Sequence, residues 1–314
     1  MDERVRGSAA TEGYQRCHLS SGHRAGYPWR GQSSLRIPGC YLNSGSKISI
    51  TMARGKKSYD VVIFCGGRGT RLSEKTREMP KPLIELGEYP ILWHIMKIYG
   101  HHGLNRFVLA LGYKGEMISD YFLNRHPLAR DFTVELARPK PPKAPEDWEI
   151  TFAQTGIESK TAKRLLLCRD HIRTRPFMVT YGDGVADIDL RALAARHTVL
   201  KKKHGVVATI TITRPYSKYG IVKMDGDLVE TFREKPLMDE FINVGFMVVE
   251  EGIFSYIRPG EDVMFEETLQ EVAEDGKLGY HVHEGFWHPM DTYKDYEDLN
   301  RMWKEDPAWK IWND

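Results

Sequence analysis

The stretch VVIFCGGRGTRLSEKT, residues 61–76, decides the fold of this chain. Its first five residues are all apolar, and three glycines (Gly66, Gly67 and Gly69) follow within the next four positions. A strand that is apolar at nearly every position is buried on both faces, as in parallel sheets covered by helices. The glycines that end it predict a tight turn at the carboxyl edge of the sheet, where open α/β sheets bind ligands.

The rest of the chain repeats this pattern. Apolar runs at 106–112, 177–183 and 205–213 alternate with helix-length amphipathic stretches at 90–102, 114–124 and 190–203. This alternation predicts an α/β fold with a Rossmann-like, mostly parallel sheet flanked by helices. Beyond residue 213 the strands become shorter and alternating, with a hairpin turn at Asp225-Gly226, so we expect a small antiparallel extension. Four prolines in residues 138–148 predict an irregular surface loop.

Composition narrows the class of protein. The chain has 314 residues, 41% hydrophobic content and no apolar run of about 18 residues, so we expect a soluble protein without a membrane partner. The whole chain has a net charge of +2, but residues 1–51 alone carry +4, so the net charge of the rest is −2. The charge therefore gives no argument for a nucleic-acid partner of the folded part. Four cysteines without paired spacing predict a reducing, cytoplasmic location.

Residues 1–51 lack the periodicity of a helix or a strand and are rich in Gly, Ser and Arg. Such a segment cannot bury enough apolar area to offset its ordering entropy. Met52 stands just ahead of the first strand. We therefore expect residues 1–51 to be a disordered leader, or an extension from an upstream start codon, and residues 52–314 to form the folded domain.

The glycine turn does not match two common phosphate-binding motifs. A dinucleotide fingerprint that starts at Gly67 would need glycine where Leu72 stands, and no Gly-Lys-Ser/Thr triplet follows as a P-loop requires. A turn that holds a phosphate through backbone N–H groups remains, with Thr70 and Arg71 as added donors. A turn that is merely glycine-rich also remains.

Lys81 stands between Pro80 and Pro82, ten residues after Arg71. Because proline fixes φ and restricts the residue before it, we expect this lysine on a stiff, extended segment. Rigid display of one ammonium group suits the binding of an anion, although an ordinary surface lysine is the alternative.

Seven motifs in order carry a family resemblance. They are GGRGTRL with PKPLIELGEYPILWH, LGYKGEMISDYF, TYGDGVADID, FREKP, INVGF and GFWHPMDT. Over residues 59–312 the chain resembles the sugar-1-phosphate nucleotidylyltransferases, and among them the glucose-1-phosphate cytidylyltransferases.

The resemblance implies a nucleotidyltransferase fold whose antiparallel extension binds the sugar. It also implies transfer of CMP from CTP to glucose 1-phosphate in nucleotide-sugar and polysaccharide biosynthesis, with Mg²⁺ as cofactor and a homo-oligomeric state. Use of UTP or dTTP, use of a different sugar 1-phosphate, and a non-catalytic regulatory protein that binds sugar nucleotides remain open.

The resemblance assigns roles to particular residues. It implies Arg71 and Lys81 as catalytic residues and Asp183 and Asp291 as metal ligands. It implies nucleotide contacts from Gly66, Gly67, Gly69, Thr70, Arg71 and Gly112, and sugar-phosphate contacts from Gly182, Glu234, Lys235 and Asn243.

The residues alone leave other roles open for four of these positions. Asp183 in its Gly-flanked turn suits Mg²⁺ but could be a plain turn residue. Asp291 could cap a helix that begins near Thr292. Glu234 and Lys235 could form an exposed ion pair.

One departure from the cytidylyltransferase pattern concerns the ligand site. Ala162 and Lys163 stand where that group usually has two glycines, just before Arg164. We expect side chains there to narrow the site, which leaves the identity of the sugar and the base open.

Overall fold

The computed structural model describes residues 58–72, 76–125 and 146–313. Residues 56–314 form one compact unit. The expectations for residues 1–51, and most of the proline-rich segment 138–148, lie outside the described residues. Within the described residues, no helix has the length and apolar character needed to cross a membrane.

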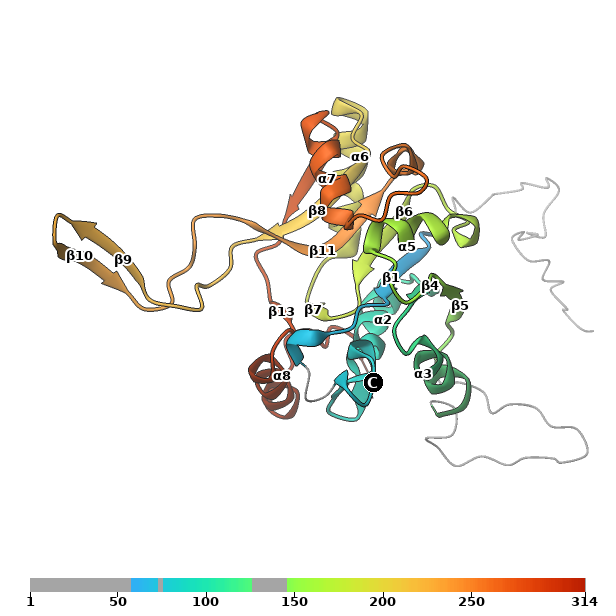
Figure 1. Ribbon diagram of the computed structural model, residues 1–314, viewed down its shortest axis with the longest axis horizontal. Coiled ribbons are helices and arrows are strands. Elements are labelled where there is room, and N and C mark those ends of the chain that lie inside the picture. The colour runs from blue at the N-terminus through green and yellow to red at the C-terminus, as the bar shows by residue number, and fades with distance from the viewer. Residues whose placement is uncertain (1–57, 73–75, 126–145, 314) are drawn as a thin grey trace, which may run out of the picture. The chain divides into compact units, whose positions relative to one another are not determined.

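A seven-stranded sheet forms the centre of this unit (Figure 1). Its strands lie in the order β12-β8-β11-β6-β1-β4-β5, and β11 is antiparallel to both of its neighbours. The β1–β4, β1–β6, β4–β5 and β8–β12 pairs are parallel. The strands are β1 Val61–Cys65, β4 Arg106–Leu111, β5 Glu149–Gln154, β6 Phe177–Tyr181, β8 Ala208–Thr213, β11 Ile242–Val249 and β12 Leu278–Val282.

Helices and shorter elements join these strands. The α-helices are α2 Ile91–His101, α3 Gly115–Asp120, α5 Thr161–Leu167, α6 Leu190–His204, α7 Phe265–Glu274 and α8 Tyr293–Glu305. The 3-10 turns are η1 Thr70–Leu72, η2 Lys81–Leu83, η4 Arg169–His171 and η5 Glu251–Ser255, and η3 Tyr121–Arg125 is a π-turn. Short paired strands are β2 Glu85–Leu86 with β3 Tyr89–Pro90, β7 Gly184–Ala186 with β13 Trp287–Pro289, and β9 Ile221–Asp225 with β10 Leu228–Arg233.

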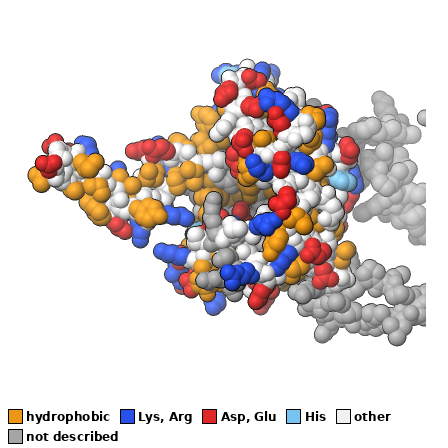
Figure 2. All heavy atoms as spheres, in the orientation of Figure 1, with side chains coloured by type: hydrophobic (Ala, Val, Ile, Leu, Met, Phe, Trp, Pro, Cys, Tyr) orange, Lys and Arg blue, Asp and Glu red, His pale blue; other side chains and the backbone are white. Residues whose placement is uncertain are grey.

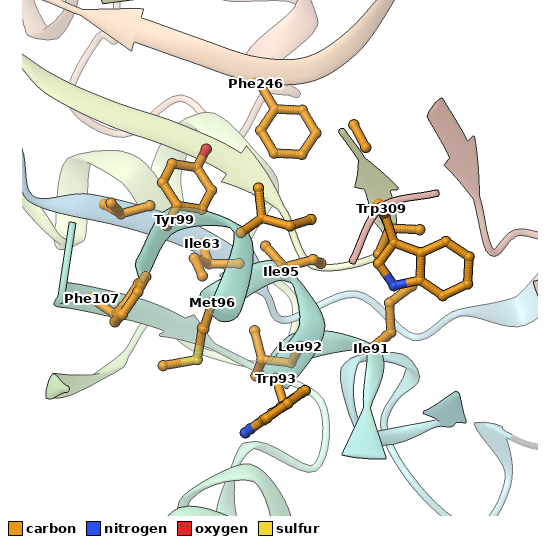
Figure 3. Close-up of a cluster of buried hydrophobic side chains, with 14 of the residues drawn as sticks. Ile63, Ile91, Leu92, Trp93, Ile95, Met96, Tyr99, Phe107, Phe246 and Trp309 are labelled. Carbon is orange, nitrogen blue, oxygen red and sulfur yellow. The ribbon is translucent and has the colours of Figure 1, made fainter. Parts of the chain in front are cut away.

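The sheet separates two hydrophobic clusters, and alternate residues of β1 enter each. Val61 and Ile63 belong to the cluster that contains α2, shown in Figure 3, whereas Val62 and Phe64 belong to the cluster that contains α5 and α7. All five residues of β1 are buried. The strand is therefore buried on both faces, which confirms the α/β, mostly parallel fold predicted from its apolar run.

The antiparallel part of the fold differs in detail from the expectation. The Asp225-Gly226 turn does join an antiparallel hairpin, β9–β10. The following strand β11 does not extend this hairpin, because it pairs between β6 and β8 in the main sheet. The hairpin itself lies apart from that sheet (Figure 1). Hydrophobic side chains are exposed along the hairpin and the segments that lead to it, as Figure 2 shows; they are Tyr216, Tyr219, Val222, Met224, Leu228, Val229, Phe232 and Leu237.

Candidate active site

One lysine joins two distant carboxylates at the carboxyl edge of the sheet. Nζ of Lys81 donates hydrogen bonds to Oδ2 of Asp183 at 2.8 Å and to Oδ1 of Asp291 at 2.7 Å. These three residues come from η2, from the end of β6 and from the end of β13. The structure thus brings together the predicted catalytic lysine and both predicted metal ligands, which lie 102 and 210 residues away from it in the sequence.

Backbone pairing holds the two carboxylates at this place. Strand β7 directly follows Asp183 and pairs with β13, which ends two residues before Asp291. The N–H of Met290 also donates to the carbonyl oxygen of Asp183 at 2.8 Å. The carboxylates are therefore neighbours because a short antiparallel ladder fixes their backbones, not because the lysine alone draws them together.

Asp291 does not cap the helix that follows it. Thr292 is the N-cap of α8, with its hydroxyl oxygen accepting from the N–H of Asp295 at 3.2 Å, and the Asp295 carboxylate accepts from the N–H of Thr292 at 2.8 Å. This capping box leaves the carboxylate of Asp291 directed to Lys81. The helix-cap alternative for Asp291 is therefore wrong.

Lys81 begins a single 3-10 turn, so the expectation that this stiff segment is extended at Lys81 is wrong. Pro80 is extended, with φ −68° and ψ 146°, but Lys81, Pro82 and Leu83 are helical. The fixed φ of proline also fits a helical turn, so Pro82 supports either conformation. Gly182 lies beneath this turn, where an added Cβ would come within 2.9 Å of the carbonyl oxygen of Phe64 and 3.3 Å of Pro82.

The two carboxylates control the charge of Lys81. Burial alone would lower the pKa of this lysine, but attraction to Asp183 and the hydrogen bonds to Asp183 and Asp291 outweigh it, so its pKa is raised. The side chain of Lys81 is 11% exposed, and those of Asp183 and Asp291 are 36% and 31% exposed. Lys81 is therefore an ammonium at neutral pH, and it lies between two partly exposed Asp side chains.

The donor set of this cluster fits Mg²⁺ in part. Asp183 and Asp291 converge on one cation, and Mg²⁺ is commonly held by one or two carboxylates together with phosphate oxygens and water. The described residues contain no group of three or more His, Cys, Asp and Glu side chains placed to hold a metal. The protein can thus supply two ligands, and the remaining ones must come from a substrate and solvent.

The glycines of the opening turn have different physical roles. An added Cβ on Gly67 would meet nothing within 4 Å, so this backbone is open to a ligand. Gly69 has φ +61°, a left-handed conformation that favours glycine. Thr70 is exposed, and the backbone of Arg71 lies in η1. The side chain of Arg71, the predicted catalytic arginine, lies outside the described residues.

Gly66 and Gly112 make room for a buried arginine. An added Cβ would come within 2.2 Å of the Arg164 guanidinium at Gly66 and within 2.4 Å at Gly112. Arg164 is 3% exposed and donates to the carbonyl oxygens of Gly66, Leu111, Gly156 and Ile157 and to the hydroxyl of Thr155. Burial lowers the pKa of Arg164, which has neutral oxygens as its direct partners. No sequence motif indicates a role for this residue, because four of its five partners are backbone carbonyl oxygens.

Two cavities border the candidate site. One of about 250 Å³ lies beside the glycine turn and is lined by Gly66, Gly67, Arg68, Glu158, Lys160 and Arg164, among others. Arg68 and Glu158 form an ion pair in its lining. The other cavity, about 200 Å³, is lined by Asp183, Asp291, Asn243 and Trp287, among others. A larger cavity of about 370 Å³ lies at the amino ends of β1 and β6, away from these groups, and is lined mainly by apolar side chains.

The predicted sugar-phosphate residues separate into two groups. Asn243 shares a cavity with both carboxylates, and its Oδ1 accepts from the N–H of Gly245 at 3.0 Å. Glu234 and Lys235 lie just after β10 and form an exposed ion pair at 3.6 Å. Lys235 has φ +44°. The structure of the single chain thus places these two residues with the hairpin, whereas Gly182 and Asn243 lie with the Lys81 cluster.

The departure at Ala162 and Lys163 does not narrow the cavity beside the glycine turn. Ala162 is fully buried in the cluster that contains α5, and neither residue lines that cavity. Cys65 is also buried, as expected for a small residue that ends a strand, and burial raises its pKa strongly. A thiol in this state is a poor nucleophile.

Comparison with known proteins gives the family. The family model described as "Nucleotidyl transferase" matches residues 60–306. The chain is 42% identical over 255 residues to a probable glucose-1-phosphate cytidylyltransferase of Bacillus subtilis (strain 168), covering 80% of this chain and 99% of that protein. It is 40% identical over 257 residues to the glucose-1-phosphate cytidylyltransferase of Salmonella typhi, covering 80% and 98%.

Solved structures agree on the fold. The UTP-bound UGPase of Acinetobacter baumannii matches with a TM-score of 0.58 at 14% identity, over 81% of this chain and 96% of that one. A putative glucose-1-phosphate thymidylyltransferase of Bacillus anthracis matches with a TM-score of 0.55 at 18% identity, over 79% and 96%. At these identities the likeness concerns the fold alone. The resemblance seen in the motifs is confirmed, and the chain belongs to the nucleotidyl transferase family.

Proposed function

We propose that this protein transfers CMP from CTP to glucose 1-phosphate, giving CDP-glucose and pyrophosphate. The observation that carries the proposal is the Lys81–Asp183–Asp291 cluster, at the sheet edge where nucleotides bind in open α/β folds. Identities of 40–42% to glucose-1-phosphate cytidylyltransferases over nearly their whole length support this choice of base and sugar.

The reaction needs no protein nucleophile. An oxygen of the sugar phosphate attacks the α-phosphorus of CTP and forms the new P–O bond. The bond from the α-phosphorus to the oxygen that bridges it to the β-phosphorus breaks, and pyrophosphate leaves. The protein must align two polyanions and offset their repulsion. A unit charge about 4 Å away contributes roughly 4 kcal/mol at an effective dielectric of 20, and alignment can contribute about 7–11 kcal/mol.

The residues divide this work between the two substrates. The open backbone at Gly67, with Gly69, Thr70 and Arg71, binds the triphosphate, and Gly66 and Gly112 form the wall held by Arg164. Lys81 holds phosphate oxygens during the transfer. Asp183 and Asp291 would hold Mg²⁺, which when bound neutralises phosphate charge. On the sugar side, Gly182 and Asn243 lie beside the carboxylates, and Glu234 and Lys235 bind the sugar phosphate from the hairpin.

We infer further that the protein is a homo-oligomer and that the β9–β10 hairpin forms the interface. Every residue of β10 is exposed, and Met224 and Leu228 are each 76% exposed. A two-stranded ribbon is marginally stable alone, and apolar exposure on this scale marks an interaction surface. A second copy of the chain is the proposed partner. We place the reaction in the cytoplasm. Its product would supply nucleotide sugar for polysaccharide synthesis.

Pyrophosphate release tests the proposed activity. The purified full chain is assayed with each of CTP, UTP, dTTP and GTP, combined with glucose 1-phosphate and other sugar 1-phosphates, in the presence of Mg²⁺. We expect the highest kcat/KM for CTP with glucose 1-phosphate, and a loss of at least 100-fold in kcat for Asp183→Asn. A different best pair would reassign the base or the sugar, and no turnover with any pair would indicate a regulatory protein that binds sugar nucleotides.

A further inference from the structure

The ammonium of Lys81 lies where a cation shared by the two carboxylates would lie. Its Nζ contacts Asp183 and Asp291 at 2.8 and 2.7 Å, so one positive group already uses an oxygen of each proposed metal ligand. The ladder between β7 and β13 fixes the backbones that carry these carboxylates. The ladder therefore keeps the two carboxylates close enough to share one cation.

The ammonium and a divalent cation compete for this position for two reasons. The ammonium already takes one oxygen of each carboxylate and leaves a metal ion only the other oxygen of each, and like charges repel strongly at such short range. The side chain of Lys81 is only 11% exposed, so water screens this repulsion weakly. Binding of a metal ion to both carboxylates therefore requires the Lys81 ammonium to leave them.

We propose that Lys81 is a resident counter-cation that keeps the Asp183–Asp291 pair closed to divalent metal until a triphosphate draws its ammonium away. A triphosphate carries several anionic oxygens and offers the ammonium new partners. It also supplies the ligands that the two carboxylates lack. The metal then enters together with the nucleotide, and the free protein binds it weakly. The role of the triphosphate here rests on the proposed function, whereas the competition between lysine and metal does not.

Direct measurement of metal binding tests the proposal. Mn²⁺ is titrated into the full chain without nucleotide, and free Mn²⁺ is followed by electron paramagnetic resonance. We expect Lys81→Met to bind Mn²⁺ at least tenfold more tightly than the wild type, because the competing charge is gone. Adding Asp183→Asn to that variant should remove the gain. Equal affinity of Lys81→Met and wild type would overturn the proposal.

A matched control separates this effect from a general loss of positive charge. Lys201 of α6 forms an ion pair with Glu250 at 2.7 Å and lies outside the candidate site. Lys201→Met should therefore leave the Mn²⁺ affinity unchanged. Lys81→Arg keeps a cation at the site and should bind Mn²⁺ as weakly as the wild type. Tight Mn²⁺ binding by Lys81→Arg or Lys201→Met would contradict the competition.

A second measurement uses the wild type alone, in case Lys81→Met fails to fold. A CTP analogue with a methylene group between the α- and β-phosphorus atoms cannot react, and it should increase Mn²⁺ binding to the protein at least tenfold beyond the Mn²⁺ held by the free analogue. No increase would overturn the proposal. If Lys81→Met gains Mn²⁺ affinity while no substrate pair releases pyrophosphate, the proposed function fails and the competition stands. If pyrophosphate is released but Lys81→Met gains no Mn²⁺ affinity, the proposed function stands and the competition fails.

Discussion

The guanidinium of Arg164 donates a hydrogen bond to the carbonyl oxygen of Gly66 at 3.1 Å, across 98 residues of sequence. The same side chain holds the carbonyl oxygens of Leu111 and Gly156 at 3.0 and 2.7 Å. One buried cation thus joins the ends of β1, β4 and β5, and Arg164 itself lines the cavity beside the glycine turn together with Gly66 and Ile157. The shape of the proposed nucleotide site therefore depends on a residue that need not contact the phosphates.

Replacing Arg164 should weaken nucleotide binding more than sugar-phosphate binding. Arg164→Met removes the guanidinium donor of the Gly156 and Ile157 carbonyl oxygens, whereas those of Gly66 and Leu111 keep the N–H donors of Tyr113 and Thr155. Loss of these charge-assisted hydrogen bonds should cost about 3 kcal/mol in the free energy of unfolding. Arg164→Lys keeps the charge but cannot reproduce the planar fork, so it should fold and raise the KM for CTP at least tenfold. Urea unfolding and the KM values for both substrates provide the measurements. A similar rise in both KM values would indicate a general structural role.

Two glycine substitutions should separate ligand binding from folding. Gly67→Ala adds a methyl group where nothing lies within 4 Å, so thermal stability should stay within about 1 °C while affinity for CTP falls at least tenfold. Gly112→Ala drives Cβ into the Arg164 guanidinium and should lower stability by about 2 kcal/mol or more. Calorimetry and CTP binding are compared in both variants. Unchanged CTP affinity in Gly67→Ala would remove this turn from the nucleotide site.

The sequence predicts single strands and turns of this fold better than it predicts which strands pair. The run at 61–65 has an apolar residue at each position, and it alone predicts a strand buried on both faces. The insertion of β11 between β6 and β8 has no such local signal, because pairing partners far apart in sequence decide it. For the same reason the sequence places Asp225-Gly226 in a hairpin turn but does not show that the hairpin lies apart from the sheet.

Some residues of the candidate site were also predictable from the sequence, and others were not. Spacing and proline content identified Lys81, and family motifs added Asp183 and Asp291, which the structure places in contact with it. The sequence did not indicate a role for Arg164. Four of its five hydrogen-bond partners are backbone carbonyl oxygens, and every residue type has one, so the sequence cannot identify them. The unusual need for glycine at both 66 and 112 is the signal that could have indicated a large buried side chain between them.

Acid should destabilise the fold through a buried histidine. His94 is fully buried, its Nε2 lies 2.9 Å from the carbonyl oxygen of Leu86, and its Nδ1 accepts from the indole N–H of Trp309 at 3.4 Å. Burial lowers the pKa of His94 from 6.5 to about 4, against the smaller opposing effect of its backbone hydrogen bonds. The unfolded chain therefore binds this proton first as the pH falls.

The sign of the effect follows from this depressed pKa. The contribution of His94 is fully present above pH 6.5 and is lost as the pH falls toward 4. The slope approaches about 1.4 kcal/mol per pH unit for one proton. We expect the free energy of unfolding of His94→Gln to be lower than that of the wild type at pH 7, but with a smaller decrease between pH 6.5 and 4.5. Parallel curves for the two proteins would show that His94 does not cause the acid dependence.

Charge on the hairpin should separate the subunits without unfolding them. Val229 and Phe232 are 61% and 63% exposed in the single chain, so replacing both with lysine removes little packing within the chain beyond the contact of the Phe232 ring with Gly220. In an oligomer the same lysines would bury unpaired charge at the interface, which is costly. Light scattering should show an oligomer for the wild type and a monomer for Val229→Lys/Phe232→Lys, with the circular dichroism spectrum unchanged.

A matched substitution tests whether this effect belongs to the hairpin. Leu123 is 62% exposed on η3, away from β9 and β10, and Leu123→Lys makes a comparable change in polarity. We expect this variant to keep the oligomeric state of the wild type, because its side chain lies outside the proposed interface. An oligomer that survives both hairpin lysines, or that dissociates with Leu123→Lys alone, would place the subunit contact on another surface.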